Sequence, residues 1–281
     1  GLSPAVCICL VYVLDRKTAL RREIRTAVRI EIGYLIFLFV TIPCGMVFSV
    51  SADNIYSRGP HFYIYVVMYF GAILYLSAST VITAREFQNR SRLLIYPLIL
   101  FVMAETIIQV ALPELHVTWL CVTLLSVLYF IYCSEMWNQL DALTGLLNQN
   151  SYLKQTGGVR YKGGVLVVFD VDDFKQINDR YGHIQGDLCL AGIAECIKKS
   201  YANFGYCYRI GGDEFCVLLK NGGNEGRCKQ EFLQRLQEKR GEIAFLPTVS
   251  YGSAPFSGED IVKVKDRADQ DMYCLLYTSP S

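Results

Sequence analysis

The sequence predicts two regions of different fold class: an α-helical membrane bundle of about five spans, followed by a water-soluble α+β domain. At 281 residues the chain has room for about two domains of roughly 150 residues each. Hydrophobic residues make up 52% of the chain and the mean hydropathy is +0.28, so the apolar residues must gather where water does not reach. Of 27 Lys and Arg and 26 Asp and Glu, the first 133 residues hold only 10 and 7. We therefore expect a multi-pass, sensory membrane region over residues 1–133, a short linker over 134–143 and a globular domain over 144–281.

Five apolar segments are candidates for the spans. Residues 32–50 and 62–84 carry no charge over 19 and 23 positions, which is sufficient because about 20 helical residues cross a bilayer core. Three further segments are less regular: residues 1–14, 93–113 and 117–133. The first is expected to be the end of a span that begins before the given sequence. Glu105 interrupts the second, and an intramembrane carboxyl is either a functional group or a protonated side chain bonded to a neighbouring helix.

Basic residues in the loops predict the orientation of the membrane region. The loop over residues 15–29 has six Lys or Arg, the loop over 51–60 has one, the loop over 85–92 has three and the loop over 112–116 has none. This alternation follows the positive-inside rule. It predicts a multi-pass protein of the cytoplasmic membrane, with the lipid bilayer as a partner and everything after Cys133 in the cytoplasm. The net charge of +1 gives no indication of a nucleic-acid groove.

Helices and strands alternate in the second half of the chain. Residues 163–171, "GGVLVVFDV", are a run of β-branched and apolar residues typical of a buried strand. Shorter apolar runs on either side of "GGDE" predict a hairpin. The remaining expected elements are helices over 150–157, 189–204, 225–240 and 258–273 and a strand over 245–254. This order predicts one sheet with helices packed on it.

Acidic residues follow two of the expected strands. The buried strand ends on Asp170, with Asp172 and Asp173 just beyond it, and the hairpin carries Asp213 and Glu214. A carboxylate at the end of a buried strand is costly unless it meets a cation. If the hairpin lies beside that strand, Asp170 and Asp213 converge and offer the hard oxygen ligands that Mg²⁺ prefers. Asp172 and Asp173 are expected to cap the following helix or to face water.

Two glycines precede Asp213 in the stretch "RIGGDEF". Gly211 and Gly212 are expected to allow positive φ in a tight turn and to leave a surface against which a nucleotide can lie. The alternative for this stretch alone is a solvated acidic turn.

The stretch "DFKQINDRYGHIQGD", residues 173–187, lies between the two acidic groups. Lys175 is able to offset negative charge that develops on phosphorus. Asn178 and Asp187 have the acceptors and donors to bind the edge of a guanine. Considered alone, His183 would be a packed or solvent-facing histidine and Lys175 a surface lysine.

Five motifs in order resemble the GGDEF domain of diguanylate cyclases. They are "DALTGLLN" (141–148), "FDVDDFKQINDRYGHIQGD" (169–187), "RIGGDEF" (209–215), "SYGSA" (250–254) and "RADQDMY" (267–273). The resemblance implies a sheet like that of the polymerase palm and adenylyl cyclases. It also implies condensation of two GTP into cyclic di-GMP with release of two pyrophosphates, on Mg²⁺ or Mn²⁺, in a homodimer joined through this domain.

The resemblance also implies residue roles. Asp170, Asp213 and the Val171 carbonyl match the metal ligands, and Asp213 matches the proton acceptor, with Glu214 as the adjacent signature acid. Lys175 matches the residue that stabilises the transition state. The GTP-binding positions implied are Asn178, His183, Asp187, Gly211 and Gly212.

The sequence departs from the family pattern at its end. From Cys274 to Ser281 it reads "CLLYTSPS", with Leu276 where the family has a lysine, so the C-terminal end is expected to be atypical or truncated. This departure keeps a second reading open: a catalytically degenerate GGDEF module that binds GTP and regulates a partner. A polytopic transporter is disfavoured because one intramembrane acid makes a poor transport pathway.

Overall fold

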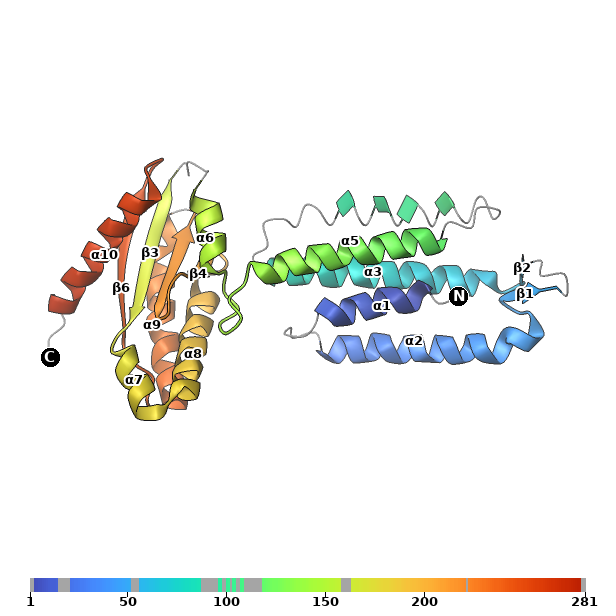
Figure 1. The fold of residues 1–281 in the computed structure, drawn as a ribbon, viewed down its shortest axis with the longest axis horizontal. Helices are drawn as coiled ribbons and strands as arrows, with labels where there is room; N and C mark the ends of the chain where they lie inside the picture. Colours follow the sequence, from blue (N-terminus) through green and yellow to red (C-terminus); the bar gives the residue numbers. More distant parts are fainter. Residues whose placement is uncertain are drawn as a thin grey trace. The chain divides into compact units, whose positions relative to one another are not determined.

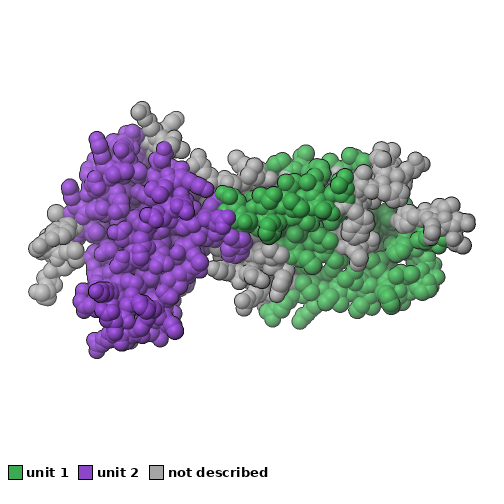
Figure 2. Space-filling model, viewed as in Figure 1, with its two compact units in different colours: residues 1–136 green, residues 137–281 purple. Residues whose placement is uncertain are grey.

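The computed structural model describes residues 3–14, 21–51, 56–86, 118–157, 163–220 and 222–278, with short pieces between residues 96 and 108. The chain divides into two compact units, residues 1–136 and 137–281 (Figure 2). The helix α5, Thr118–Asn138, runs past the predicted boundary at residue 133 and through the first half of the predicted linker.

The first unit is built mainly from helices. They are α1 (Ser3–Leu14), α2 (Arg21–Thr41), α3 (Phe62–Glu86) and α5, with a short 3₁₀ turn, η2 (Ile42–Cys44), after α2. The strands β1 (Phe48–Val50) and β2 (Tyr56–Arg58) pair antiparallel between α2 and α3. Thr80 of α3 and Tyr129 of α5 share a buried hydrogen bond of 3.0 Å between their hydroxyl groups.

Three helices of the described residues are long and apolar enough to cross a membrane: Arg25–Cys44, Phe62–Thr83 and Leu120–Asn138. The expected total of about five spans is therefore not reproduced. Residue Glu105, with most of the expected span over 93–113, lies outside the described residues.

The first complete span predicted, residues 32–50, is wrong in its bounds. The helix begins at Arg21 and ends at Thr41, and Pro43 lies in the 3₁₀ turn that follows. Gly45, at φ 62°, then takes the left-handed conformation that ends this turn. Residues 48–50 belong to a strand because the chain has already turned there, so uninterrupted hydropathy did not indicate where the helix stops.

The second unit contains a four-stranded antiparallel sheet in the order β4-β5-β3-β6 (Figure 1). The strands are β3 (Gly164–Val171), β4 (Gly205–Arg209), β5 (Glu214–Leu219) and β6 (Val249–Phe256). The helices are α6 (Gln149–Thr156), α7 (Phe174–Tyr181), α8 (His183–Tyr201), α9 (Glu225–Glu242) and α10 (Ile261–Thr278). The α+β sheet with flanking helices predicted from the sequence is thereby confirmed.

Two apolar layers cover the two faces of this sheet. On one face, Val167 and Phe169 of β3 pack with residues of α8 and α9, such as Ile193 and Phe232. On the other face, Val168 packs with residues of α6 and α10. The central strand β3 is buried from Val165 to Phe169, because it has a strand on each side and helices on both faces. Asp170, which follows this buried run, is therefore held in place by the packed core.

Helix α8 begins six residues before the start that periodicity predicted. Gly182, at φ 83°, separates α7 from α8, a backbone conformation that suits glycine. The first turns of α8 are polar or exposed, so the apolar repeat begins only at Cys189. This early start places His183 and Asp187 on a helix.

Candidate active site

The acidic site lies at the end of β3. Asp170 is half-buried and pairs in register with Glu214 of β5 on one side and with Ser250 of β6 on the other. Two carboxylates directly opposite each other on antiparallel strands repel unless a cation lies near them. The register therefore concentrates negative charge at the end of β3, next to the start of β5.

The turn between β4 and β5, residues 210–213, is called the signature turn below. It is tied to the end of β3 by backbone hydrogen bonds. The Val171 amide donates to the Asp213 carbonyl over 3.3 Å, and the Ile210 and Gly211 amides donate to the Glu214 carbonyl over 3.0 and 3.3 Å. Asp213, which no strand includes, is thereby held beside Val171. The structure thus brings together Asp170, Val171, Asp213 and Glu214.

Electrostatics at Asp170 fit a cation site. Burial raises the pKa of this carboxyl above its ordinary value, and the negative charges of Asp213 and Glu214 raise it further. A divalent cation would relieve both effects. Within the described residues, no group of three or more His, Cys, Asp or Glu side chains forms a metal cluster. The set expected here, two carboxylates and one backbone carbonyl, falls below that number and still consists of the oxygen ligands that Mg²⁺ accepts.

The prediction of positive φ at Gly211 and Gly212 is wrong, since neither is among the positive-φ glycines of the described chain. A Cβ on Gly211 would lie 3.2 Å from the Glu214 side chain. A larger residue at 211 would therefore press on the Glu214 side chain, which would have to shift slightly. A Cβ on Gly212 would meet no atom within 4 Å, so this glycine leaves open space beside the acids.

Asp172 has a different role from the helix cap expected for it. Its carboxylate accepts hydrogen bonds from the hydroxyls of Thr248 and, over 2.7 Å, Ser250. Asp173 lies at φ 53° and accepts from the Gln176 side chain over 2.7 Å without capping the backbone of α7. Asp172 thus fastens the residues after β3 to β6. The sequence offered no signal for this contact, because Thr248 and Ser250 are more than 70 positions away.

Four of the residues expected to contact the nucleotide, Lys175, Asn178, His183 and Asp187, lie on α7 and α8. Lys175, His183 and Asp187 are exposed, and His183 and Asp187 are one helical turn apart on α8. Asn178 of α7 is half-buried and lies over Gly186, where a Cβ would stand only 2.0 Å from the Asn178 Oδ1. Gly186 therefore lets the Asn178 side chain rest directly on α8. Sequence reasoning did not single out Gly186.

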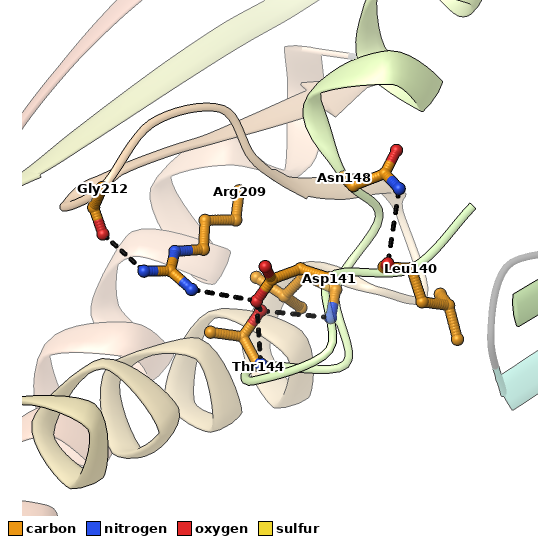
Figure 3. A network of polar contacts seen from close by, with 7 residues as sticks. Leu140, Asp141, Thr144, Asn148, Arg209 and Gly212 are labelled. Atoms are coloured by element: carbon orange, nitrogen blue, oxygen red, sulfur yellow. Dashed lines mark hydrogen bonds and ion pairs between the residues drawn. The ribbon is translucent and has the colours of Figure 1, made fainter. Parts of the chain in front are cut away.

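A polar network joins the start of the unit to the signature turn (Figure 3). The Arg209 guanidinium donates to the Asp141 carboxylate over 3.1 Å and to the Gly212 carbonyl over 2.6 Å. The same Asp141 oxygen accepts from the Thr144 amide and hydroxyl over 2.9 and 2.6 Å. Arg209 thus holds the residues just after α5 and the turn in one arrangement. The Asp-x-x-Thr spacing in "DALT" was the available signal for this local cap.

Backbone contacts support this network. The Leu147 amide donates to the Cys207 carbonyl over 3.0 Å, and the Arg209 amide donates to the Leu147 carbonyl over 2.8 Å. Asn148 caps α6 by accepting from the Ser151 amide, and its own amide group donates to the Asn138 carbonyl over 2.8 Å. Residues 138–148 are therefore bonded to the edge strand β4 and to α6.

The Asp141 pair makes a testable contribution to stability. Burial acts against the charged form, but the hydrogen bonds from Thr144 and Arg209 outweigh it, so the folded-state pKa of Asp141 lies below its ordinary value. The stabilisation is therefore complete above the unfolded pKa of about 3.9 and is lost as the pH falls through the lower folded value. We expect Asp141→Asn to lower the unfolding free energy by about 1–2 kcal/mol at pH 7.

Denaturation of both chains between pH 3 and pH 8, followed by circular dichroism, checks this prediction. The difference between wild type and Asp141→Asn should be constant above about pH 5 and should shrink below about pH 4. A difference that stays unchanged down to pH 3 would contradict the assigned ion pair.

Comparisons with known proteins give matches over the second unit. A family model, "Diguanylate cyclase, GGDEF domain", matches residues 138–278. Among similar proteins, the probable diguanylate cyclase DgcI of Escherichia coli strain K12 is 40% identical over 96 residues, which are 34% of this chain and 21% of that protein. The diguanylate cyclase DgcP of Pseudomonas aeruginosa is 36% identical over 150 residues, 47% of this chain and 22% of that protein. The chain thus aligns with about a fifth of the length of these two relatives.

A solved structure of a microbial GGDEF domain, described for its interaction with bis-(3,5)-cyclic di-GMP, is 30% identical. It covers 50% of this chain and 95% of the solved chain with a TM-score of 0.41. The family model covers half of the chain and includes every residue of the acidic site and of α7 and α8. The chain therefore belongs to the diguanylate cyclase GGDEF-domain family.

Proposed function

We propose that this protein condenses two molecules of GTP into cyclic di-GMP with release of two pyrophosphates. The observation that carries the proposal is the convergence of Asp170, Asp213 and Glu214 at the end of β3. Burial and the acidic neighbours raise the pKa of Asp170 there. Such an arrangement is suited to a divalent cation and to the phosphates that accompany it.

The residues that would hold Mg²⁺ or Mn²⁺ are Asp170, Asp213 and the carbonyl of Val171. The ion, when bound, would lower the pKa of a ribose 3′-hydroxyl and offset charge on the pyrophosphate leaving group. Asp213 is the proton acceptor for that hydroxyl and Glu214 supports it from the start of β5. Lys175, exposed in the first turn of α7, offsets negative charge on the phosphoryl oxygens.

The guanine side of the site is formed by α7 and α8. Asn178 and Asp187 hydrogen-bond the base edge, since a carboxylate accepts from the ring N–H and the exocyclic amine while an amide serves the ring acceptors. His183, at the start of α8, contributes to substrate binding. The space beside Gly212 accommodates the nucleotide against the turn.

The reaction joins two GTP molecules by two transfers. In each transfer a bond forms between the 3′-oxygen of one GTP and the α-phosphorus of the other. The bond from that phosphorus to pyrophosphate breaks, and the 3′-hydroxyl proton passes to Asp213. Two such transfers close the ring. Because one domain offers one such site, the active species is a homodimer with two domains facing each other.

The membrane region regulates this dimer in the same proposal. The three apolar helices anchor the chain in the cytoplasmic membrane, with the GGDEF domain in the cytoplasm. Residues 138–148 follow α5 directly and bond to Arg209, so they are the connection through which a change at α5 reaches the signature turn.

Product analysis tests the function. The full chain in detergent micelles is incubated with GTP and Mg²⁺, and the nucleotides are separated by chromatography. Cyclic di-GMP and pyrophosphate in a ratio of one to two are expected. Bound but unchanged GTP would contradict the cyclase and support the GTP-binding regulatory module, which Leu276 in place of the family lysine favours.

A further inference from the structure

Helix α10 packs on the sheet face that carries two of the site carboxylates. Val264 and Ala268 of α10 pack against Val168 of β3 and Cys216 of β5. Side chains two positions apart on a strand point to the same face. Asp170, two residues after Val168, and Glu214, two residues before Cys216, therefore point toward the side of the sheet that α10 covers.

An ion pair on α10 belongs to the helix that covers this face of the sheet. The Lys265 ammonium is 3.1 Å from the Asp269 carboxylate, and the two side chains are 29% and 35% exposed. Lys265 interacts electrostatically with Glu214 as well as with Asp269, and Asp269 interacts electrostatically with Asp170. Burial alone would lower the pKa of Lys265, but the hydrogen bond and these negative charges raise it above its ordinary value.

The other charged side chains of α10 up to Asp271 lie elsewhere. Arg267 donates to the Pro255 carbonyl and to Glu259, and Asp271 accepts from the Ser253 amide. Lys263 and Asp266 are exposed. Lys265 and Asp269 thus differ from these side chains in being half-buried, in pairing with each other, and in the electrostatic effects that link Asp269 to Asp170 and Lys265 to Glu214.

We propose that Lys265 and Asp269 are positioning residues that together set the charge around the metal site. Lys265 offsets the negative charge of Asp269, so a cation at the site meets only the charge of Asp170, Asp213 and Glu214. The inference rests on the proposed function, because it takes Asp170 and Asp213 as metal ligands. Lys265 limits the affinity of the site for a divalent cation, and Asp269 raises it.

Opposite effects follow for the two single variants. Lys265→Gln leaves Asp269 unbalanced, so the site becomes more negative and should bind a divalent cation about threefold to tenfold more tightly. Asp269→Asn leaves Lys265 unbalanced and should weaken binding by a similar factor. The double variant removes both charges and should return close to wild type. A merely structural role predicts weaker binding in all three.

Mn²⁺ binding tests the inference without turnover. The full chain in detergent micelles is titrated with Mn²⁺ in the presence of α,β-methylene GTP, which cannot release pyrophosphate, and free Mn²⁺ is followed by electron paramagnetic resonance against a nucleotide-only blank. Lys263→Gln and Asp266→Asn are the matched controls, being exposed charges on the same helix. Circular dichroism verifies that each variant is folded.

The outcomes separate this inference from the proposed function. If wild type binds Mn²⁺ above the blank, Asp213→Asn loses it and the two α10 variants shift in opposite directions, the inference holds. If Asp213→Asn loses it but the α10 variants match their controls, the metal site stands and the inference is overturned. If wild type binds no Mn²⁺ above the blank, the metal site itself fails and the inference fails with it.

Discussion

Asp213→Asn is expected to reduce the initial rate of cyclic di-GMP formation by about a thousandfold. The substitution removes one negative charge and replaces one carboxylate oxygen by an amide nitrogen, which does not bind Mg²⁺, in a group in which Asp170 and Glu214 are the other acids. It leaves the backbone contact intact, because the Asp213 carbonyl, which accepts from the Val171 amide over 3.3 Å, is present in asparagine as well. The turn should therefore keep its place while the site loses the metal ligand and the proton acceptor proposed for it.

The measurement is pyrophosphate release at saturating GTP with increasing Mg²⁺. Asp266→Asn is the matched control, since it makes the same chemical change at an exposed carboxylate of α10 and should retain wild-type activity. A rate for Asp213→Asn within about tenfold of wild type, in a chain with unchanged circular dichroism, would exclude Asp213 as both ligand and base.

Gly186→Ala is expected to raise the KM for GTP by about tenfold or more and to destabilise the domain by about 1–3 kcal/mol. A Cβ at this position would lie 2.0 Å from Oδ1 and 3.0 Å from Cγ of Asn178, and 3.2 Å from Cζ of Phe174. Because Gly186 is buried within α8, the methyl group has no open space, and the side chain it meets at the shortest distance, Asn178, is the group that has to move. Asn178 must turn away from its place over α8, and the guanine contact proposed for it is lost.

Two further variants test the physical reason for this prediction. Gly226→Ala, in α9, meets no atom within 4 Å and should be neutral or slightly stabilising, since alanine favours a helix over glycine. The double variant Gly186→Ala with Asn178→Ala removes the clashing amide, so it should recover part of the lost stability but none of the GTP affinity. Recovery of both would contradict the role of Asn178 in binding the base.

Much of the secondary structure was predictable from local patterns. The β-branched run of β3 and the apolar repeats of α8, α9 and α10 correspond to observed elements, because burial on a strand or a helix leaves a period in the sequence. Element ends were less predictable. The span expected over 32–50 stops early at a proline and a left-handed glycine, and α8 starts early because its first turns are exposed and carry no apolar repeat.

The candidate site was predictable as a set of residues and less so as an arrangement. Asp170 and Asp213 were expected to converge, and the structure places them at the same end of β3, with Glu214 opposite Asp170. The glycines of the turn were expected to have positive φ and do not. What limits the residue at 211 is instead the close approach of the Glu214 side chain. Arg209, Gly186 and the contact of Asp172 with Thr248 and Ser250 were missed, because each depends on a residue from another element.

The amino-acid sequence alone determined which residue types are available and where apolar runs form strands and helices. It thereby indicated two chemically distinct halves, a buried strand that ends in acidic residues, and a glycine-rich acidic turn. Only the tertiary structure decided that Glu214 lies opposite Asp170, that Asp172 bonds to β6 rather than to α7, and that α10 with Lys265 and Asp269 covers the sheet face of the carboxylates. The physical reason is that a period of two or of 3.6 residues specifies which face of an element is buried, whereas the register between strands and the neighbours of a helix depend on packing between segments far apart in the chain.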